Sequence, residues 1–216
     1  MVAGRSNDPH MAASIVAAAL DVRMRPIDIL LGLVSPTLYC IGNEWEDGTV
    51  SVADEHRHTA FCELVFELVR DMIATDKSDH PIVEPADIIL MNAPGNTHTL
   101  GIRFLELWLT SNGSGSLVLD PPPAIEELAR VVQTTQPKFL LISVALPEQM
   151  AAVSQIVELL SRAAVGTKPQ IIVGGYAVKF GLVQPIAGIA LASDINQLTG
   201  LIAAETLPAL NRVPQT

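Results

Sequence analysis

The sequence predicts an α/β protein in which an N-terminal helical bundle precedes a doubly wound, five-stranded parallel sheet. Two observations predict this fold class. From about residue 10 to residue 75, apolar side chains recur every three or four positions, as on one face of a helix. From residue 88 onward, short apolar runs alternate with amphipathic segments long enough for crossover helices, which is typical of parallel strands.

The first half reads as successive helices. The segment MAASIVAAALDVR is rich in strong helix formers, and Pro26 suits the start of the next helix. The expected apolar face of that helix carries Ile27, Leu30, Leu31, Val34, Leu38 and Ile41. Pro36 is expected to bend or break it. Ser51 is the expected N-cap of a later helix, whose apolar face carries Phe61, Leu64, Val65, Leu68 and Met72.

A polar segment with two prolines, Thr75–Asp87, separates the halves and is typical of a linker. The expected strands beyond it are IILMNA, SLVLD, FLLISVA, QIIVGG and IAGIALA. We therefore predict a helical domain over residues 1–78 and a Rossmann-like domain over residues 86–216. Five parallel strands favour a flavodoxin-like sheet, whose ligand site lies beyond the carboxyl ends of the strands.

Composition limits the classes of function. With 216 residues, 49% of them apolar, and a net charge of −10, the chain can bury a large core but offers no basic patch for a phosphate backbone. It shows no helix-turn-helix or finger pattern, so we expect no direct contact with nucleic acid. Charge or proline interrupts the apolar runs before about 18 residues, which predicts no membrane span and a cytoplasmic protein. Cys40 and Cys62 are expected to be buried free thiols.

Small and polar residues follow three of the predicted strands. Asn96, His98 and Gly101 come after the first strand, and Ser143 lies near the end of the third. Gly174 and Gly175 form a pair at the end of the fourth strand. Because the carboxyl ends of parallel strands meet at one edge, these residues are expected to converge on one crevice.

This edge resembles the cobalamin-binding domain of methionine synthase and the corrinoid mutases. Their pattern is an acidic residue, any residue, His, two residues and Gly, followed by a Ser segment and a Gly-Gly turn. The resemblance implies that His98 is the lower ligand of cobalt, and that the nucleotide tail of the cofactor passes Ser143 and the glycines. Asn96 replaces the acidic residue. Its amide oxygen can accept from the ring N–H, so ligation is expected to persist with different tuning.

The helical half resembles the cap of light-sensing CarH-like repressors, in which a Trp is followed after nine residues by Glu-His. Trp45, Glu55 and His56 reproduce this spacing. The resemblance implies that they surround the 5′-deoxyadenosyl group on the upper face of the corrin. In those repressors a His follows the Trp and ligates cobalt after illumination. Here that position is Glu46, which leaves His56, His58 or water as alternatives.

The whole chain from about residue 10 is thus similar to cobalamin-binding photoreceptors. No segment resembles the DNA-binding domain of the CarH-like repressors, so the closer likeness is to AerR-like antirepressors or to photocobilins. The implied cofactor is adenosylcobalamin, with a bilin such as biliverdin as a second candidate. By this resemblance the protein is not an enzyme, and light would change its conformation and signal through a protein partner or a homo-oligomer. His58 is expected to be a polar residue on the protein surface.

Two other functions stay open. One is a corrinoid shuttle protein of a methyltransferase system, although the Leu-Pro-Gly-Met-like segment usual in such caps is replaced by LVSPTLYC. The other is a cobalamin carrier, which would bind the cofactor without responding to light. A shuttle would accept a methyl group from a partner enzyme, whereas a sensor would change shape when illuminated.

Overall fold

The computed structural model describes residues 7–75, 87–163 and 168–206, and the chain divides into two compact units. The helical unit falls within Met1–Glu84 and also takes in Arg103–Ser114. The sheet unit falls within Pro85–Ile102 and Gly115–Thr216. The predicted linker Thr75–Asp87 lies almost entirely outside the described residues. Chain order would assign Arg103–Ser114 to the sheet unit, but the structure assigns this segment to the helical unit.

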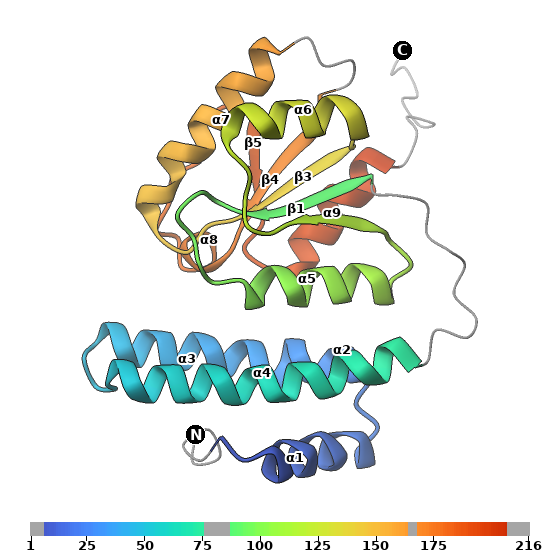
Figure 1. The fold of residues 1–216 in the computed structure, drawn as a ribbon, viewed down its shortest axis with the longest axis vertical. Helices are drawn as coiled ribbons and strands as arrows, with labels where there is room; N and C mark the ends of the chain where they lie inside the picture. The colour runs from blue at the N-terminus through green and yellow to red at the C-terminus, as the bar shows by residue number, and fades with distance from the viewer. Residues whose placement is uncertain (1–6, 76–86, 164–167, 207–216) are drawn as a thin grey trace, which may run out of the picture. The chain divides into compact units, whose positions relative to one another are not determined.

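The helical unit is built around one long helix. Its elements are α1 (Pro9–Asp21), α2 (Pro26–Ile29), the π-helical turn η2 (Leu30–Val34), α3 (Ser35–Glu46) and α4 (Val52–Thr75) (Figure 1). Helices α1 and α3 both pack against α4. The Ser51 Oγ accepts a hydrogen bond from the Asp54 N–H at 3.1 Å, which confirms the predicted N-cap and sets the start of α4.

Of the two outcomes predicted at Pro36, a bend or a break, the break does not occur, because helix continues through this residue. The π-helical turn Leu30–Val34 immediately precedes it, and the Ser35 N–H bonds to the Leu30 carbonyl, five residues earlier. This wider turn accommodates the proline ring and its missing donor, so helix continues on both sides. By length and composition, the resulting run Pro26–Glu46 is long enough to cross a membrane. That is weak evidence for a span, because core helices of soluble proteins satisfy the same criterion.

Burial confirms the predicted apolar faces and corrects two single residues. All members of both predicted faces are buried or half-buried. His58 is not on the surface: it is only 4% exposed, and its Nδ1 lies 2.8 Å from the Asp54 carbonyl oxygen. Its place three and seven positions before buried apolar residues puts it on the inner face of α4. Cys40 is exposed, with its Sγ 3.7 Å from the Glu44 carboxylate, whereas Cys62 is buried as predicted.

The sheet unit confirms the predicted fold class. Its strands are β1 (Ile88–Asn92), β2 (Ser116–Leu119), β3 (Phe139–Ser143), β4 (Gln170–Gly174) and β5 (Ile189–Leu191). All pairings are parallel, in the order β2-β1-β3-β4-β5, which is the flavodoxin-like order. Its helices are α6 (Ile125–Thr135), the 3₁₀ turn η4 (Pro147–Gln149), α7 (Met150–Arg162), α8 (Tyr176–Lys179) and α9 (Ile195–Thr206).

The core of this unit lies between the sheet and helices α6 and α7. Alternate strand residues such as Ile89, Met91 and Ile142 join Leu128 of α6 and Ile156 of α7 in one buried cluster. Neighbouring strand residues that point the other way are also buried, as expected for a parallel sheet covered on both faces. Figure 1 shows α6 and α7 on one face of the sheet and α9 on the other.

Helix α5 (Leu100–Ser111) begins in the sheet unit and continues into the helical unit. Within the helical unit, the ring of Phe104 stacks on Phe66 with centroids 5.2 Å apart. The Arg103 guanidinium lies 4.4 Å from the Phe66 ring centroid and pairs with Glu67 at 2.5 Å. A stacked ring pair and a cation over an aromatic face therefore hold this part of α5 against α4.

Candidate functional site

Three strand ends lie side by side at the carboxyl edge of the sheet. Asn92 at the end of β1 is in register with Ser143 at the end of β3, and Ser143 is in register with Gly174 at the end of β4. The Gly175 turn and the loop that carries His98 both leave from this row. The structure thus brings together the residues that the sequence placed at the ends of the first, third and fourth strands.

The loop between β1 and α5 is held by two asparagines. Asn96 is 5% exposed, and its Nδ2 donates to the Ser143 carbonyl at 3.0 Å and to the Asn92 Oδ1 at 3.2 Å. Its Oδ1 accepts from the backbone N–H of His98 at 3.0 Å, rather than from the ring N–H as the sequence suggested. Asn96 therefore shapes the loop through the backbone of His98.

His98 is exposed, and its ring has no hydrogen-bond partner among the described residues. Over the same residues, no group of three or more His, Cys, Asp or Glu side chains is placed to hold a metal ion. A corrin, in contrast, brings its own equatorial nitrogens and needs only one axial ligand from the protein. An exposed imidazole on a fixed backbone fits that requirement.

The glycines of the motif have different physical roles. Gly175 has φ +100°, and a Cβ there would lie 2.5 Å from the Val144 carbonyl oxygen, so only glycine fits the protein itself. At Gly174 a Cβ would lie 3.2 Å from the Ala192 carbonyl oxygen. A Cβ at Gly101 would meet nothing within 4 Å. The surface beside the first turn of α5 is therefore open at Gly101.

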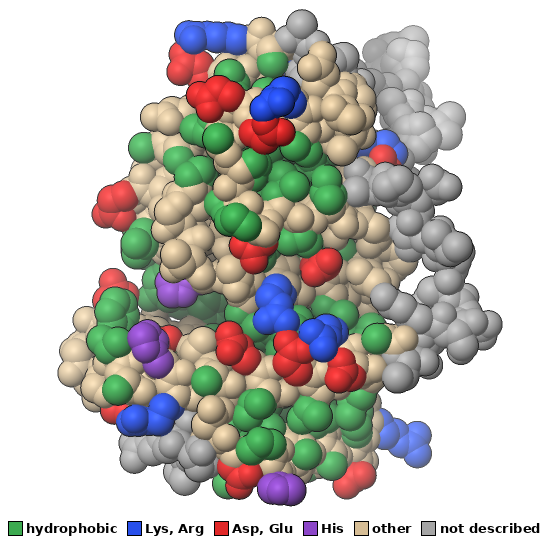
Figure 2. Space-filling view, in the orientation of Figure 1, with side chains coloured by type: hydrophobic (Ala, Val, Ile, Leu, Met, Phe, Trp, Pro, Cys, Tyr) green, Lys and Arg blue, Asp and Glu red, His purple; other side chains and the backbone are tan. Residues whose placement is uncertain are grey.

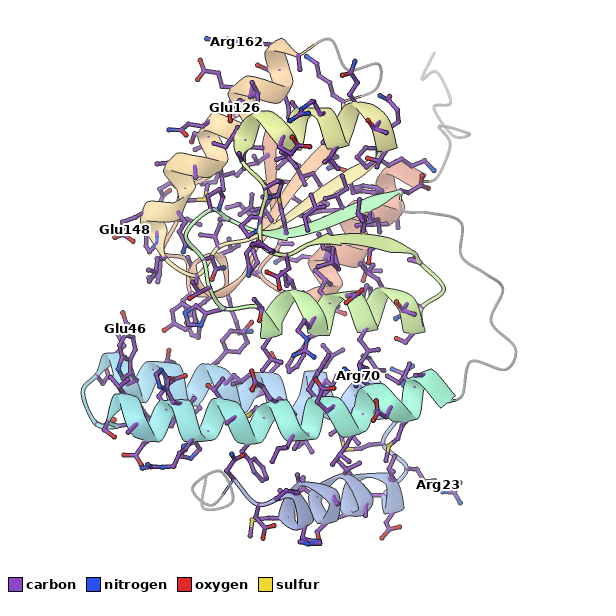
Figure 3. All side chains as sticks on the ribbon, viewed as in Figure 1. Arg23, Glu46, Arg70, Glu126, Glu148 and Arg162 are labelled. Atoms are coloured by element: carbon purple, nitrogen blue, oxygen red, sulfur yellow. The ribbon has the colours of Figure 1, made fainter. Side chains whose placement is uncertain are left out.

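The predicted upper-face residues lie at one end of the α3–α4 hairpin. Trp45 is in the last turn of α3 and is 49% exposed. Glu55 and His56 are in the first turns of α4, with the His56 Nε2 3.5 Å from the Glu55 carboxylate. Glu55 also accepts from the Thr59 hydroxyl at 2.7 Å. Figure 3 shows Glu46 at the same end of α3, beside the turn that leads into α4.

These side chains differ in accessibility. The side chain of His56 is 74% exposed and that of Glu55 is 23% exposed, whereas His58 is buried. Trp45 and His56 are thus open to a ligand or partner, and Glu55 is fixed by its neighbours. Further along α4, acidic and basic side chains such as Glu67 and Arg70 are paired with each other, and Figure 2 shows both signs interspersed there on the viewed face.

Asn92 was not identified as a site residue from the sequence. It ends the apolar run IILMNA, where a polar residue reads as a simple strand end. The only available signal was an amide inside a run of otherwise buried apolar residues. Its side chain bonds to Asn96 and to the His98 carbonyl in the following loop, and Asn96 in turn bonds to the Ser143 carbonyl at the end of β3.

Comparison with known proteins relates parts of this chain to a family and to a repressor. The B12 binding domain family model matches residues 5–70. The HTH-type transcriptional repressor CarH of Myxococcus xanthus is 27% identical over 118 residues, which cover 55% of this chain and 37% of that protein. The chain therefore spans little more than a third of the length of this curated relative.

The solved structures include a full-length structural match. The monomethylamine corrinoid protein of Methanosarcina barkeri superposes with a TM-score of 0.73 and 16% sequence identity, over 95% of this chain and 93% of that one. At this identity the likeness shows a shared fold. The family match in the helical segment supports a cobalamin-binding module.

Proposed function

We propose that this protein is a cobalamin-dependent light sensor without catalytic turnover of its own. It signals through a protein partner or a change in self-association. The observation that carries the proposal is the placing of Trp45, Glu55 and His56 at one end of the α3–α4 hairpin. They lie inside the segment that matches the B12 binding domain model. Similarity to the repressor CarH points the same way.

His98 is the proposed lower ligand of cobalt. Its ring is accessible, and its backbone is fixed by the loop. A neutral imidazole is a good ligand for cobalt. Ser143, Gly174 and Gly175 form the strand-end surface along which the nucleotide tail would run, and Gly101 leaves the open space beside α5.

Adenosylcobalamin would supply a cobalt–carbon bond that visible light breaks. The chain's own task is to sense whether the upper ligand is present. Trp45 would pack against the adenosyl group, while Glu55 and His56 would make polar contacts with it. Loss of those contacts would remove the free energy that favours the dark state of the helical unit, and the population would shift to another state.

The acidic composition supports output through a protein rather than through direct DNA contact. Direct binding to nucleic acid is therefore not proposed, although the similar repressor CarH is of the HTH type. A bilin such as biliverdin belongs to the proposal as a second chromophore, by resemblance to the photocobilins.

A corrinoid shuttle protein is the second candidate. The likeness to the monomethylamine corrinoid protein over 95% of this chain is the observation in its favour. A methyltransferase component and a sensor can share this fold, so the fold alone does not decide between them. The Trp and Glu-His arrangement argues for the sensor, since a shuttle must expose the upper face of its cofactor to a partner enzyme.

The test is reconstitution with adenosylcobalamin in the dark, followed by green light, for wild type and His98→Ala. In the dark, we expect the wild-type absorption spectrum of cobalamin with His98 coordinated to cobalt. This spectrum should change irreversibly on illumination, and His98→Ala should lack the histidine-coordinated form. Size-exclusion chromatography of the dark and lit states then reports the output. A parallel sample with biliverdin tests bilin binding.

The outcomes separate the candidates. Absence of bound cobalamin in the wild type would reject the proposed cofactor. Bound cobalamin whose photolysis leaves the hydrodynamic size and the hydrogen exchange of the helical unit unchanged would favour the shuttle or a carrier. Trp45→Ala sharpens the test: since Trp45 is 49% exposed, loss of its buried half should lower stability by about 1–2 kcal/mol, while the light response should be altered.

A further inference from the structure

Asn92 and Asn96 hold the main chain of His98 from both sides. The Asn96 Oδ1 accepts the His98 N–H at 3.0 Å, and the Asn92 Nδ2 donates to the His98 carbonyl at 3.3 Å. The two side chains are also joined to each other at 3.2 Å. Both backbone polar groups of His98 are therefore bonded to one amide pair.

This amide pair is buried and anchored to the sheet. Asn92 is 0% exposed and Asn96 is 5% exposed. Asn92 is the last residue of β1, and Asn96 donates to the Ser143 carbonyl at 3.0 Å. Burying amide groups is favourable only when their hydrogen bonds are made. Here those bonds are made to His98, to Ser143 and within the pair, so the burial of the pair defines the path of the loop.

The ring of His98 lacks the support that a metal-bound histidine usually has. Such a ring normally donates its second N–H to a carboxylate or carbonyl, which sets its orientation. Among the described residues His98 has no such partner, and the amide of Asn96 is used on the backbone instead. Orientation of the ligand must then come from the main chain that carries it.

We propose that Asn92 is a positioning residue for His98: with Asn96 it preorganises the loop so that the imidazole is presented to cobalt without a ring-bound carboxylate. The inference rests on the proposed role of His98 and adds a residue outside the cobalamin motif. In this arrangement the imidazole of His98 is oriented by hydrogen bonds to the backbone of His98, and not by a hydrogen bond to its ring.

The test compares Asn92→Ala with the wild type and with Val132→Ala. Val132 is a fully buried core residue of α6, so its truncation lowers stability without touching the loop. The first readout needs no cofactor. In the free protein, the backbone amides of residues 93–100 should exchange hydrogen faster in Asn92→Ala than in the wild type. In Val132→Ala, their exchange relative to the rest of the sheet unit should be unchanged.

The second readout is the coordination state of bound cobalamin. At saturating cofactor, Asn92→Ala should show a smaller histidine-coordinated fraction by absorption. It should also show a weaker nitrogen splitting in the electron paramagnetic resonance spectrum of the cobalt(II) form. Its affinity should fall by about tenfold or more. Val132→Ala should stay fully histidine-coordinated. Should Asn92→Ala not fold, Asn92→Ser serves, because its shorter hydroxyl cannot reach both partners.

The inference fails if Asn92→Ala loses stability like Val132→Ala but keeps wild-type loop exchange and full histidine coordination. Asn92 would then be only structural. It also fails if the His98 N–H of the free wild-type protein exchanges as an unbonded amide. If the wild type binds no cobalamin, the proposed function is rejected, while the exchange experiment still decides whether the amide pair holds the loop.

Discussion

Replacing Gly175 with alanine tests whether the turn after β4 is as constrained as its geometry indicates. At φ +100° and ψ −173° the backbone is in a region that is essentially restricted to glycine, at a cost of about 1–3 kcal/mol for any other residue. The new Cβ would also lie 2.5 Å from the Val144 carbonyl oxygen and 2.8 Å from the Val144 nitrogen. Both are backbone atoms of a buried residue, so relief requires movement of the main chain and costs a further ~1–3 kcal/mol.

The expected loss is therefore roughly 2–6 kcal/mol, or about 2–4 °C in melting temperature for each kcal/mol. Thermal and urea unfolding of the free protein measure it. Gly101→Ala is the matched control, since its Cβ meets nothing within 4 Å and alanine favours the helix by about 0.5–1 kcal/mol. Gly101→Ala should raise stability slightly, by up to about 1 kcal/mol, and weaken cobalamin retention. A Gly175→Ala protein with the melting temperature of the wild type would refute the reasoning.

Two further predictions concern the helical unit. Burial, together with the nearby Glu63 carboxylate, raises the pKa of the Cys62 thiol from 9.0 to about 12. The free energy of unfolding should therefore be highest below pH 9 and fall between pH 9 and 12, because the thiol of the unfolded chain ionises there first. Urea titrations at several pH values measure this decrease. If Cys62→Ala showed the same decrease, the prediction would be contradicted. Arg103→Ala should cost about 1–2 kcal/mol through its contacts with Phe66 and Glu67, and an unchanged unfolding midpoint would contradict this.

Elements with a strong local period could be predicted from the sequence. The apolar faces of α3 and α4 and the five apolar strands depend on side-chain spacing, which a short window contains. The convergence of Ser143 and Gly174 at one edge also followed, because parallel strands bring their carboxyl ends together. The burial of His58 was missed although its spacing from Phe61 and Val65 contained the signal. The polarity of histidine favours an exposed position, whereas the spacing of His58 from Phe61 and Val65 indicates the buried face of α4.

The sequence by itself thus determined the fold class and the residues at the carboxyl edge of the sheet, since these follow from periodicity and from the parallel direction of the strands. Only the tertiary structure decided how they are used. The amide pair at Asn92 and Asn96, the steric requirement at Gly175 and the docking of Phe104 on Phe66 all depend on neighbours that are distant along the chain. Hydrogen bonds and packing act over a few ångströms, so their partners are known only once the strands and helices are placed.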